Sequence, residues 1–216
     1  GSATRINSQG LIEEVDDGVS RLNYPMIDGK VVGCPHHILE PERRNLITYS
    51  EDFSNAYWTK SGSSVVSNNA ISPDGSLNAS KLVENTSGGG HYVRSSNSGG
   101  SVGNKITTSF FVKADTRNWC FIIGYDGSSV WFDLSNGIVG TQNNAVGEIN
   151  LISNGWYKIS STYTSSHASR EKAYLYLSTA DNTSNYQGDG TSGIYVFGSQ
   201  LELGSYATSY IPTQGS

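Results

Sequence analysis

The side chains best suited to chemistry in this sequence are aromatic rings that recur in stretches with a strand-like pattern. Trp119, Tyr125 and Trp131 lie in one central stretch, and Tyr174 and Tyr176 alternate with leucines in a later one. Trp and Tyr rings offer flat apolar surfaces with a polar tip, and ordering them costs little conformational entropy. Flanked by hydrogen-bonding groups, such rings suit the C–H face of a sugar ring.

The sequence therefore indicates a carbohydrate-binding face, with further candidate residues near these rings. Tyr92 follows a run of three glycines and adds a sixth aromatic ring. Arg94, Lys113 and Asp133 are the expected polar partners of a bound sugar. The alternative is structural: half of these rings would line the second face of a sheet or pack under loops.

Strands must position these rings, and the segment 105–137 shows them best. Three apolar runs are separated there by short polar breaks, and apolar residues alternate with a period of two. Phe110 and Val112 share one face of the first run, and Cys120 and Ile122 share one face of the second. The opposite faces also carry large aromatic residues, which a face exposed only to water would not need.

The composition favours strands and turns over helices. Charged residues make up 15% of the chain, against roughly 25% in an ordinary soluble domain, and the chain has 25 Gly and 13 Tyr. About ten strands with no useful helical period predict an all-β fold, a two-sheet antiparallel sandwich. Turns are predicted at Pro73–Gly75 and at Asn154–Gly155, between consecutive strands.

The chain divides into two predicted parts. Residues 1–44 contain most of the charge clusters and three of the five prolines, with only short apolar pieces, so we expect an extended arm or collar. Residues 45–216 carry the strand pattern and form the expected β-sandwich domain. The chain has no heptad repeat or other trimerising repeat, so we expect a monomer in dilute solution.

Charge and hydropathy exclude some partners. The net charge of −5 and the absence of a basic stripe argue against nucleic acid. No run of about 18 apolar residues is present, so no membrane insertion is expected.

Cys34 and Cys120 are far apart and indicate neither a disulfide framework nor a zinc site. The adjacent His36 and His37 would point to opposite faces of a strand and make a poor metal pair.

Several segments together resemble a known family: 3–15 (ATRINSQGLIEEV), 39–60 (LEPERRNLITYSEDFSNAYWTK), 71–85 (ISPDGSLNASKLVEN), 110–120 (FFVKADTRNWC), 131–141 (WFDLSNGIVGT), 154–160 (NGWYKIS) and 186–213 (YQGDGTSGIYVFGSQLELGSYATSYIPT). They are similar to a recurrent domain of tail-fibre, head-fibre and other virion proteins of bacteriophages. That domain is related in pattern to the β-jelly-roll carbohydrate-binding modules of the family 4 and 9 type.

The resemblance implies a jelly roll whose concave sheet or edge loops hold sugar chains. The expected function is a non-catalytic glycan-binding domain on the virion surface, with bacterial-surface or environmental polysaccharide and other virion proteins as partners. No cofactor is required for that function. Related modules hold a structural calcium ion, for which Glu51, Asp52 and Glu202 are the candidate ligands here; the alternative is three ordinary solvated acids.

Two other functions remain open from the sequence. One is a structural decoration or assembly domain of the virion, in which the aromatic rings are buried against a neighbouring subunit. The other is a polysaccharide-cleaving enzyme, which needs two carboxylates about 5 to 10 Å apart. Because Asp133 is the one acid expected on the aromatic sheet and no G-x-S-x-G motif is present, we do not expect an enzyme.

Overall fold

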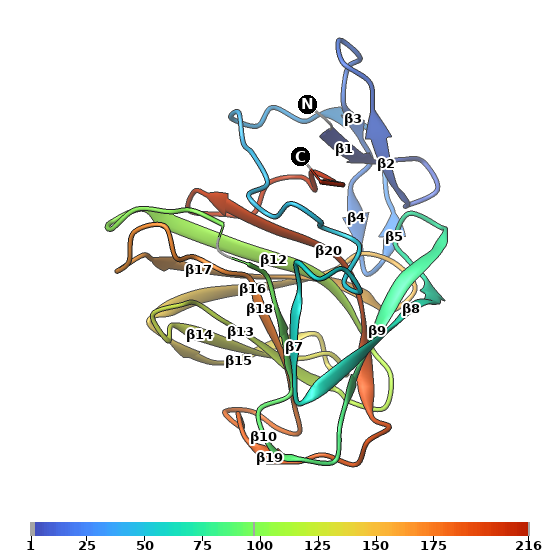
Figure 1. Cartoon of the computed structure of the whole chain (residues 1–216). Coiled ribbons are helices and arrows are strands. Elements are labelled where there is room, and N and C mark those ends of the chain that lie inside the picture. The colour runs from blue at the N-terminus through green and yellow to red at the C-terminus, as the bar shows by residue number, and fades with distance from the viewer. Residues whose placement is uncertain (1–2, 97, 216) are drawn as a thin grey trace.

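The computed structural model describes residues 3–96 and 98–215. Residues 1 and 2 of the predicted arm, and residues 97 and 216 of the predicted sandwich domain, lie outside the described ranges. Two antiparallel sheets of six strands each are the main layers of the described chain, and no helix occurs in it (Figure 1). The expected all-β class and two-sheet sandwich are confirmed.

Sheet 1 contains the longest strands. Its members are β8 (Ser63–Ile71), β9 (Leu77–Glu84), β12 (Lys105–Ala114), β16 (Ala145–Leu151), β17 (Trp156–Thr164) and β20 (Gly193–Leu203). They are ordered β16-β17-β12-β20-β9-β8, with every neighbouring pair antiparallel. β12 and β20 are therefore the two central strands.

Sheet 2 is built from shorter strands. Its members are β7 (Thr59–Ser61), β11 (Tyr92–Arg94), β13 (Trp119–Ile123), β14 (Ser129–Asp133), β15 (Ile138–Asn143) and β18 (Tyr174–Ser178). They are ordered β15-β14-β13-β18-β11-β7, again antiparallel throughout. Below the sandwich, β10 (Gly88–Gly89) pairs with β19 (Tyr186–Gln187) (Figure 1).

The core lies between the sheets and follows the predicted alternation. Phe110 and Val112 of β12 are completely buried, as are Ile122, Phe132 and Leu175 from sheet 2. Each such side chain contributes about 1.5–3 kcal/mol through burial. The alternate residues of the same strands point outward, so both outer faces of the sandwich carry aromatic rings that need some other cover.

Both predicted turns are confirmed. Asn154 and Gly155 join β16 to β17 with φ of 52° and 78°, the left-handed pair of a type I′ hairpin, in which Gly is the easiest residue to place. Pro73–Gly75 joins β8 to β9, where the Ser72 amide donates to the Ser76 carbonyl at 2.9 Å.

The number and length of the strands differ from the expectation of about ten strands of five to nine residues. The described chain has twenty strands, because six of them pair over only two residues, while β12 and β20 reach ten and eleven residues. Periodicity cannot reveal a two-residue ladder, since such a ladder depends on tertiary contacts.

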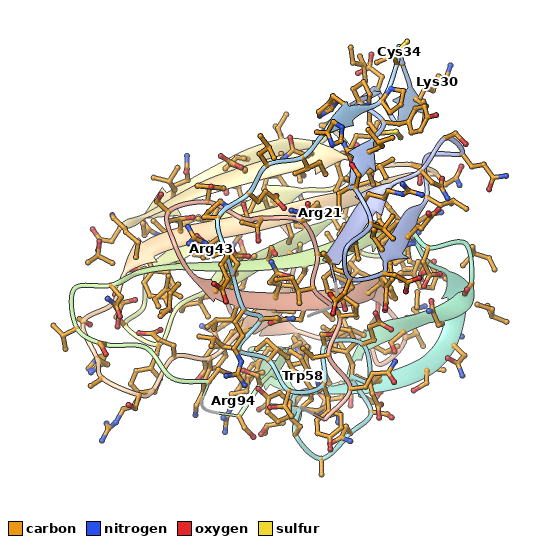
Figure 2. All side chains as sticks on the ribbon, turned by 90° about the horizontal axis from the view of Figure 1, so that it is seen from above. Arg21, Lys30, Cys34, Arg43, Trp58 and Arg94 are labelled. Carbon is orange, nitrogen blue, oxygen red and sulfur yellow. The ribbon has the colours of Figure 1, made fainter. Side chains whose placement is uncertain are left out.

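The N-terminal segment forms three small hairpin-like sheets that stand above sheet 1 (Figure 1). They pair β1 (Ala3–Ile6) with β2 (Ile12–Val15), β3 (Leu22–Asn23) with β6 (His36–His37), and β4 (Met26–Ile27) with β5 (Lys30–Val31). None of these strands joins either six-stranded sheet. Cys34 and Lys30 lie at the outer end of this arm (Figure 2).

The arm covers the outer face of sheet 1 with apolar contacts. Ile12 is 8% exposed and packs in a second cluster with Phe111, Trp156, Phe197 and Tyr210. The rings of this cluster come from β12, β17, β20 and the C-terminal segment. The arm and this segment therefore close one side of the sandwich.

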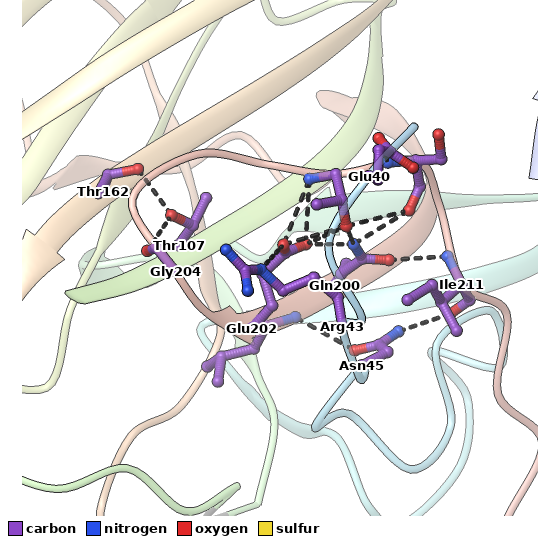
Figure 3. Close-up of polar contacts among 12 residues, drawn as sticks. Glu40, Arg43, Asn45, Thr107, Thr162, Gln200, Glu202, Gly204 and Ile211 are labelled. Carbon is purple, nitrogen blue, oxygen red and sulfur yellow. Dashed lines mark hydrogen bonds and ion pairs between the residues drawn. The ribbon is translucent and has the colours of Figure 1, made fainter. Parts of the chain in front are cut away.

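A buried carboxylate fastens the same side. Glu202 of β20 is completely buried and accepts hydrogen bonds from Gln200 Nε2 and from the amide and hydroxyl of Thr208 (Figure 3). Arg43, at the end of the arm, places its Nε 3.6 Å from Glu202. Glu40 accepts the Ser209 amide at 2.8 Å. The network joins the arm, sheet 1 and the C-terminal segment.

Deleting residues 1–44 tests how far the sandwich depends on the arm. We expect the remaining chain to unfold cooperatively at a melting temperature several degrees lower, because sheet 1 loses the cover of Ile12 and Glu202 loses Arg43. Differential scanning calorimetry measures both properties.

The matched control is Leu39→Ser, since Leu39 belongs to the arm but is 93% exposed. Its melting temperature should equal that of the parent. A truncated chain without a cooperative transition would show that the arm is part of the folding unit.

Candidate functional site

The outer face of sheet 2 carries a row of aromatic rings across four strands. Tyr92 on β11 pairs with Tyr176 on β18, Tyr176 with Phe121 on β13, and Phe121 with Trp131 on β14. Successive ring centroids are 4.3, 4.5 and 4.6 Å apart, and each pair is stacked. Cross-strand pairing of this kind fixes the rings before any ligand arrives.

A second row on the same face adds cations. Arg94 pairs with Tyr174, and Tyr174 pairs with Ile123. Lys172 precedes the start of β18 by two residues, and its Nζ lies 5.7 Å from the centroid of the Tyr125 ring. We call the half-buried set of both rows the tyrosine face: Tyr92, Arg94, Ile123, Tyr125, Lys172, Tyr174 and Tyr176.

The segment 179–185, which we call the strap, leads from β18 to β19 and crosses the other half of the aromatic row. The indole N–H of Trp131 donates to the Thr183 carbonyl at 3.3 Å. Ser178 Oγ donates to the carbonyls of Ala180 and Thr183 at 2.7 and 2.6 Å. Trp131 is consequently 5% exposed, and Phe121, stacked between Trp131 and Tyr176, is 1% exposed, although both point away from the core.

One carboxylate ties the strap to the edge of sheet 2. Asp181 accepts the Thr141 amide on Oδ1 at 2.7 Å and the Thr141 hydroxyl on Oδ2 at 2.9 Å. Gly140 allows this approach, because a Cβ there would lie 2.4 Å from Asp181 Oδ1 and 2.9 Å from the Trp119 ring.

Two tyrosines of the tyrosine face have raised pKa values. Burial raises the pKa of Tyr174 above its ordinary value, and Arg94 partly offsets this. Burial also raises the pKa of Tyr176, with a further rise from the neighbouring Tyr92 and Tyr174. Both side chains are therefore neutral hydrogen-bond donors over the physiological pH range.

The structure corrects two of the predicted sugar contacts. Trp131 was expected to be an open stacking surface, but the strap covers it. Asp133 was expected to be a polar partner, but it is 6% exposed. Its carboxylate accepts hydrogen bonds from the Ser135 amide at 2.9 Å and from Asn136 Nδ2 at 2.7 Å, as the cap of a turn.

Two other predicted residues lie away from the tyrosine face. Lys113 belongs to β12 of sheet 1, where it pairs with Trp156 and Tyr195, so it is on the wrong sheet for a partner of these rings. Trp119 is on sheet 2 and half-buried, one row beyond Phe121 and beside the strap. Tyr92, Arg94, Tyr125, Tyr174 and Tyr176 are the predicted residues that the fold brings together.

The three candidate calcium ligands are not brought together. Glu51 accepts the Tyr210 hydroxyl at 3.0 Å, and burial raises the pKa of this carboxyl. Asp52 caps a turn through the amides of Ser54 and Asn55, both at 3.1 Å. Glu202 belongs to the network under the arm. Within the described ranges, no group of three or more His, Cys, Asp or Glu side chains could hold a metal ion.

Buried acids elsewhere in the sandwich are all engaged in structural contacts. Glu171 is completely buried and accepts the hydroxyls of Tyr163 and Ser165. Glu84 is 1% exposed and receives Arg117 Nε at 2.8 Å and the Tyr186 hydroxyl at 2.7 Å. Since Tyr186 directly follows the strap, the Glu84 cluster anchors the strap's second end.

Three functional features escaped the sequence pattern. Phe121 was placed on the aromatic face of its strand but not recognised as the central ring of a stacked row. Lys172 precedes Tyr174 by two residues, a spacing that would have placed both on one face. Nothing in the polar segment 179–185 signalled that it folds back over a sheet.

Comparisons with known proteins give little similarity. No protein-family model matches the chain. No curated protein matches it either. The chain is similar to the crystal structure of the enzymatically active domain of bacteriophage CBA120 tailspike protein 4, with 16% identity and a TM-score of 0.44. The match covers 74% of this chain and 21% of that one, so the chain spans about a fifth of the tailspike structure.

This comparison corrects the expectation of a non-enzymatic, glycan-binding domain. The matched structure is described as an enzymatically active domain, so a likeness to phage proteins does not place the chain in a non-catalytic class. The expectation of a non-catalytic glycan-binding domain was therefore wrong, and the assembly domain and the polysaccharide-cleaving enzyme remain as alternatives. The comparison and the sequence resemblance coincide only in naming bacteriophage proteins.

No helix in the described chain is long and apolar enough to cross a membrane.

The Glu84 cluster predicts a specific dependence of stability on pH. Burial alone would raise the pKa of Glu84, but hydrogen bonds from Arg117, Tyr186 and the Asp189 amide lower it below the ordinary value. The carboxylate therefore stabilises the fold above the pKa of the unfolded chain, and this contribution is lost as pH falls through the lower folded pKa.

Glu84→Gln should reduce the free energy of unfolding at pH 7 by about 2–3 kcal/mol and flatten its dependence on pH between about 5 and 3. Urea titrations at several pH values measure both effects. Glu13→Gln is the matched control, because the pKa of Glu13 is also lowered but its ion pair with Arg5 is at the surface. It should change stability by less than about 1 kcal/mol. An unchanged acid slope in Glu84→Gln would contradict the assignment.

Proposed function

We propose that this chain is an assembly domain of a bacteriophage virion protein, which associates with a second copy of itself through the tyrosine face. The virion context rests on the resemblance of segments such as 45–60 and 186–213 to tail-fibre and head-fibre proteins. The surface and its partner are argued from the contacts of the tyrosine face.

The observation that carries the proposal is the composition and rigidity of this face. Tyrosine and arginine are the residue types enriched at the energetic centres of protein interfaces. Here Tyr92, Tyr174 and Tyr176 are partly exposed and already held by ring contacts, with centroid distances of 4.3 Å for the stacked Tyr92–Tyr176 pair and 5.9 Å for the tilted Tyr92–Tyr174 pair. Little rotamer entropy is left to lose when a partner binds.

The face is also self-complementary. Its seven residues supply four tyrosine rings, the two cations of Arg94 and Lys172, and no carboxylate. In a two-fold arrangement the same surface meets itself, so the cations of one protomer can lie over the tyrosine rings of its partner. The same geometry occurs within the chain, where Lys172 lies over Tyr125.

Only weak association is expected for isolated chains. The seven side chains are half-buried and form a small surface compared with a stable interface. We expect a dissociation constant of about 0.1 mM, or about −5.5 kcal/mol, so the chain is a monomer at about 1 µM. Copies held together on a particle would associate at much higher effective concentration.

Sedimentation velocity over a concentration series at physiological salt tests the proposal. Arg94→Ala and Tyr174→Ala should each weaken dimer formation by about tenfold or more, because each removes a central side chain of the interface. Tyr206→Ala is the matched control. Tyr206 is 43% exposed and stacks with Arg43, a tyrosine and arginine pair outside the tyrosine face.

Three results would overturn the proposal. The first is a dimer that Arg94→Ala and Tyr174→Ala leave as stable as the parent, and the second is the absence of any dimer at millimolar concentration. The third is release of new sugar ends from bacterial polysaccharide by the parent but not by these variants, which would assign the face to a substrate. Circular dichroism of each variant shows whether the fold is intact.

A further inference from the structure

We infer that the strap is a displaceable cover, and that the self-association surface continues beneath it as the buried half of the aromatic row. This inference rests on the proposed function, because it assigns the regulation of the same surface. Tyr92 and Tyr176 are the open end of the row, and Phe121 and Trp131 are its concealed end.

The two outer faces of the sandwich are covered in chemically different ways. The arm contributes Ile12 to a buried apolar cluster with Phe111 and Trp156, which is how a permanent cover is stabilised. The strap, 179–185, reads TADNTSN, and Ala180 is its largest apolar side chain. It therefore lies over Trp131 without a large apolar side chain of its own that would be exposed if it moved.

Hydrogen bonds at a few positions hold the strap. Asp181 binds Thr141 through the two contacts of 2.7 and 2.9 Å, and both residues are at the surface. Above the rings, the Thr183 carbonyl accepts Ser178 Oγ at 2.6 Å and, in a longer contact of 3.3 Å, Trp131 Nε1. Hydrogen bonds that can exchange with water contribute modestly to stability, so opening at the Asp181 end is inexpensive.

The second end of the strap is fixed more firmly. Tyr186 donates its hydroxyl to Glu84 at 2.7 Å, packs in a tilted arrangement against His91 with ring centroids 4.6 Å apart, and starts the short ladder with β10. Opening at Asp181 would therefore swing the strap about this end without releasing β19. The row would then present four stacked rings instead of two.

A second copy of the tyrosine face is the occupant that we assign to the uncovered rings. The concealed half is continuous with the open half, because Phe121 stacks on Tyr176 at 4.5 Å. A partner already seated on Tyr92 and Tyr176 would reach Phe121 and Trp131 by extending the same stacking contact across two more strands.

The test uses the full chain and a variant that unfastens the strap, Asp181→Ala. Hydroxyl-radical footprinting should show Trp131 modified about three- to tenfold faster, because two hydrogen bonds to Thr141 are lost. Trp58 in the core and Trp156 under the arm, each 1% exposed, serve as internal controls and should not change. Gly140→Ala offers a second route to the same state, since its methyl group would occupy the position of the Asp181 carboxylate.

Asp52→Ala is the matched control, since Asp52 is an exposed turn-capping aspartate whose contacts lie within residues 52–55. It should leave both the footprint and the association unchanged. In sedimentation, Asp181→Ala should tighten dimer formation by about three- to tenfold relative to the parent.

The outcomes separate the two proposals. If Trp131 is no more reactive in either unfastened variant, the strap is a fixed part of the fold and the inference fails, whatever the parent's association. If Trp131 is exposed but the dimer is not tightened, the strap does not regulate this surface. If the parent never dimerises, the proposed function fails, while the footprint still decides whether the strap opens.

Discussion

The burial of the Glu202 carboxylate is the constraint on which one whole side of the molecule depends. A carboxylate without water needs several donors, and no single neighbouring strand can supply them. Gln200 on the same strand and Thr208 in the C-terminal segment donate hydrogen bonds to it, and Arg43 at the end of the arm places a positive charge 3.6 Å away. The arm and the C-terminal segment are therefore fixed against β20 by the requirements of one charge, and the apolar cluster around Ile12 can form beneath them.

The period-two alternation of the central strands leaves large aromatic rings on the outer faces of both sheets, and other segments of the chain have to cover them. Burying Phe110, Ile122 and Phe132 between the sheets puts Phe111, Phe121 and Trp131 on the two outer faces. Sheet 1 meets this with an apolar arm, and sheet 2 meets it with a polar strap over half of its row. The tyrosine face is the part of the outer face of sheet 2 that no segment of the described chain covers completely. We therefore propose that a second copy of the chain binds there.

The parts of this structure that were predictable are those that follow from local pattern. The sandwich, the alternation in β12 and β13 and the hairpin at Asn154–Gly155 follow from periodicity and turn chemistry. Tyr174 and Tyr176 were placed on one face because strand parity applies within a strand, whereas the position of Tyr92 beside them depends on the pairing of β11 with β18. The misplaced residues, Lys113 and Trp131, depend on which sheet a strand joins and on a loop that folds back over it. Such contacts between distant segments leave no trace in a local pattern.

The two ends of the described chain lie on the same side of the sandwich, next to each other (Figure 1). Thr4 donates its hydroxyl to the Tyr210 carbonyl at 2.6 Å, and Tyr49 bridges to Gln214. A tensile force applied between these ends therefore bypasses the long strands of the sandwich and acts on the junction of the arm with the C-terminal segment. The contacts of that junction are loaded one after another, as in peeling. The sandwich can stay folded under such a pull while the junction extends and closes again.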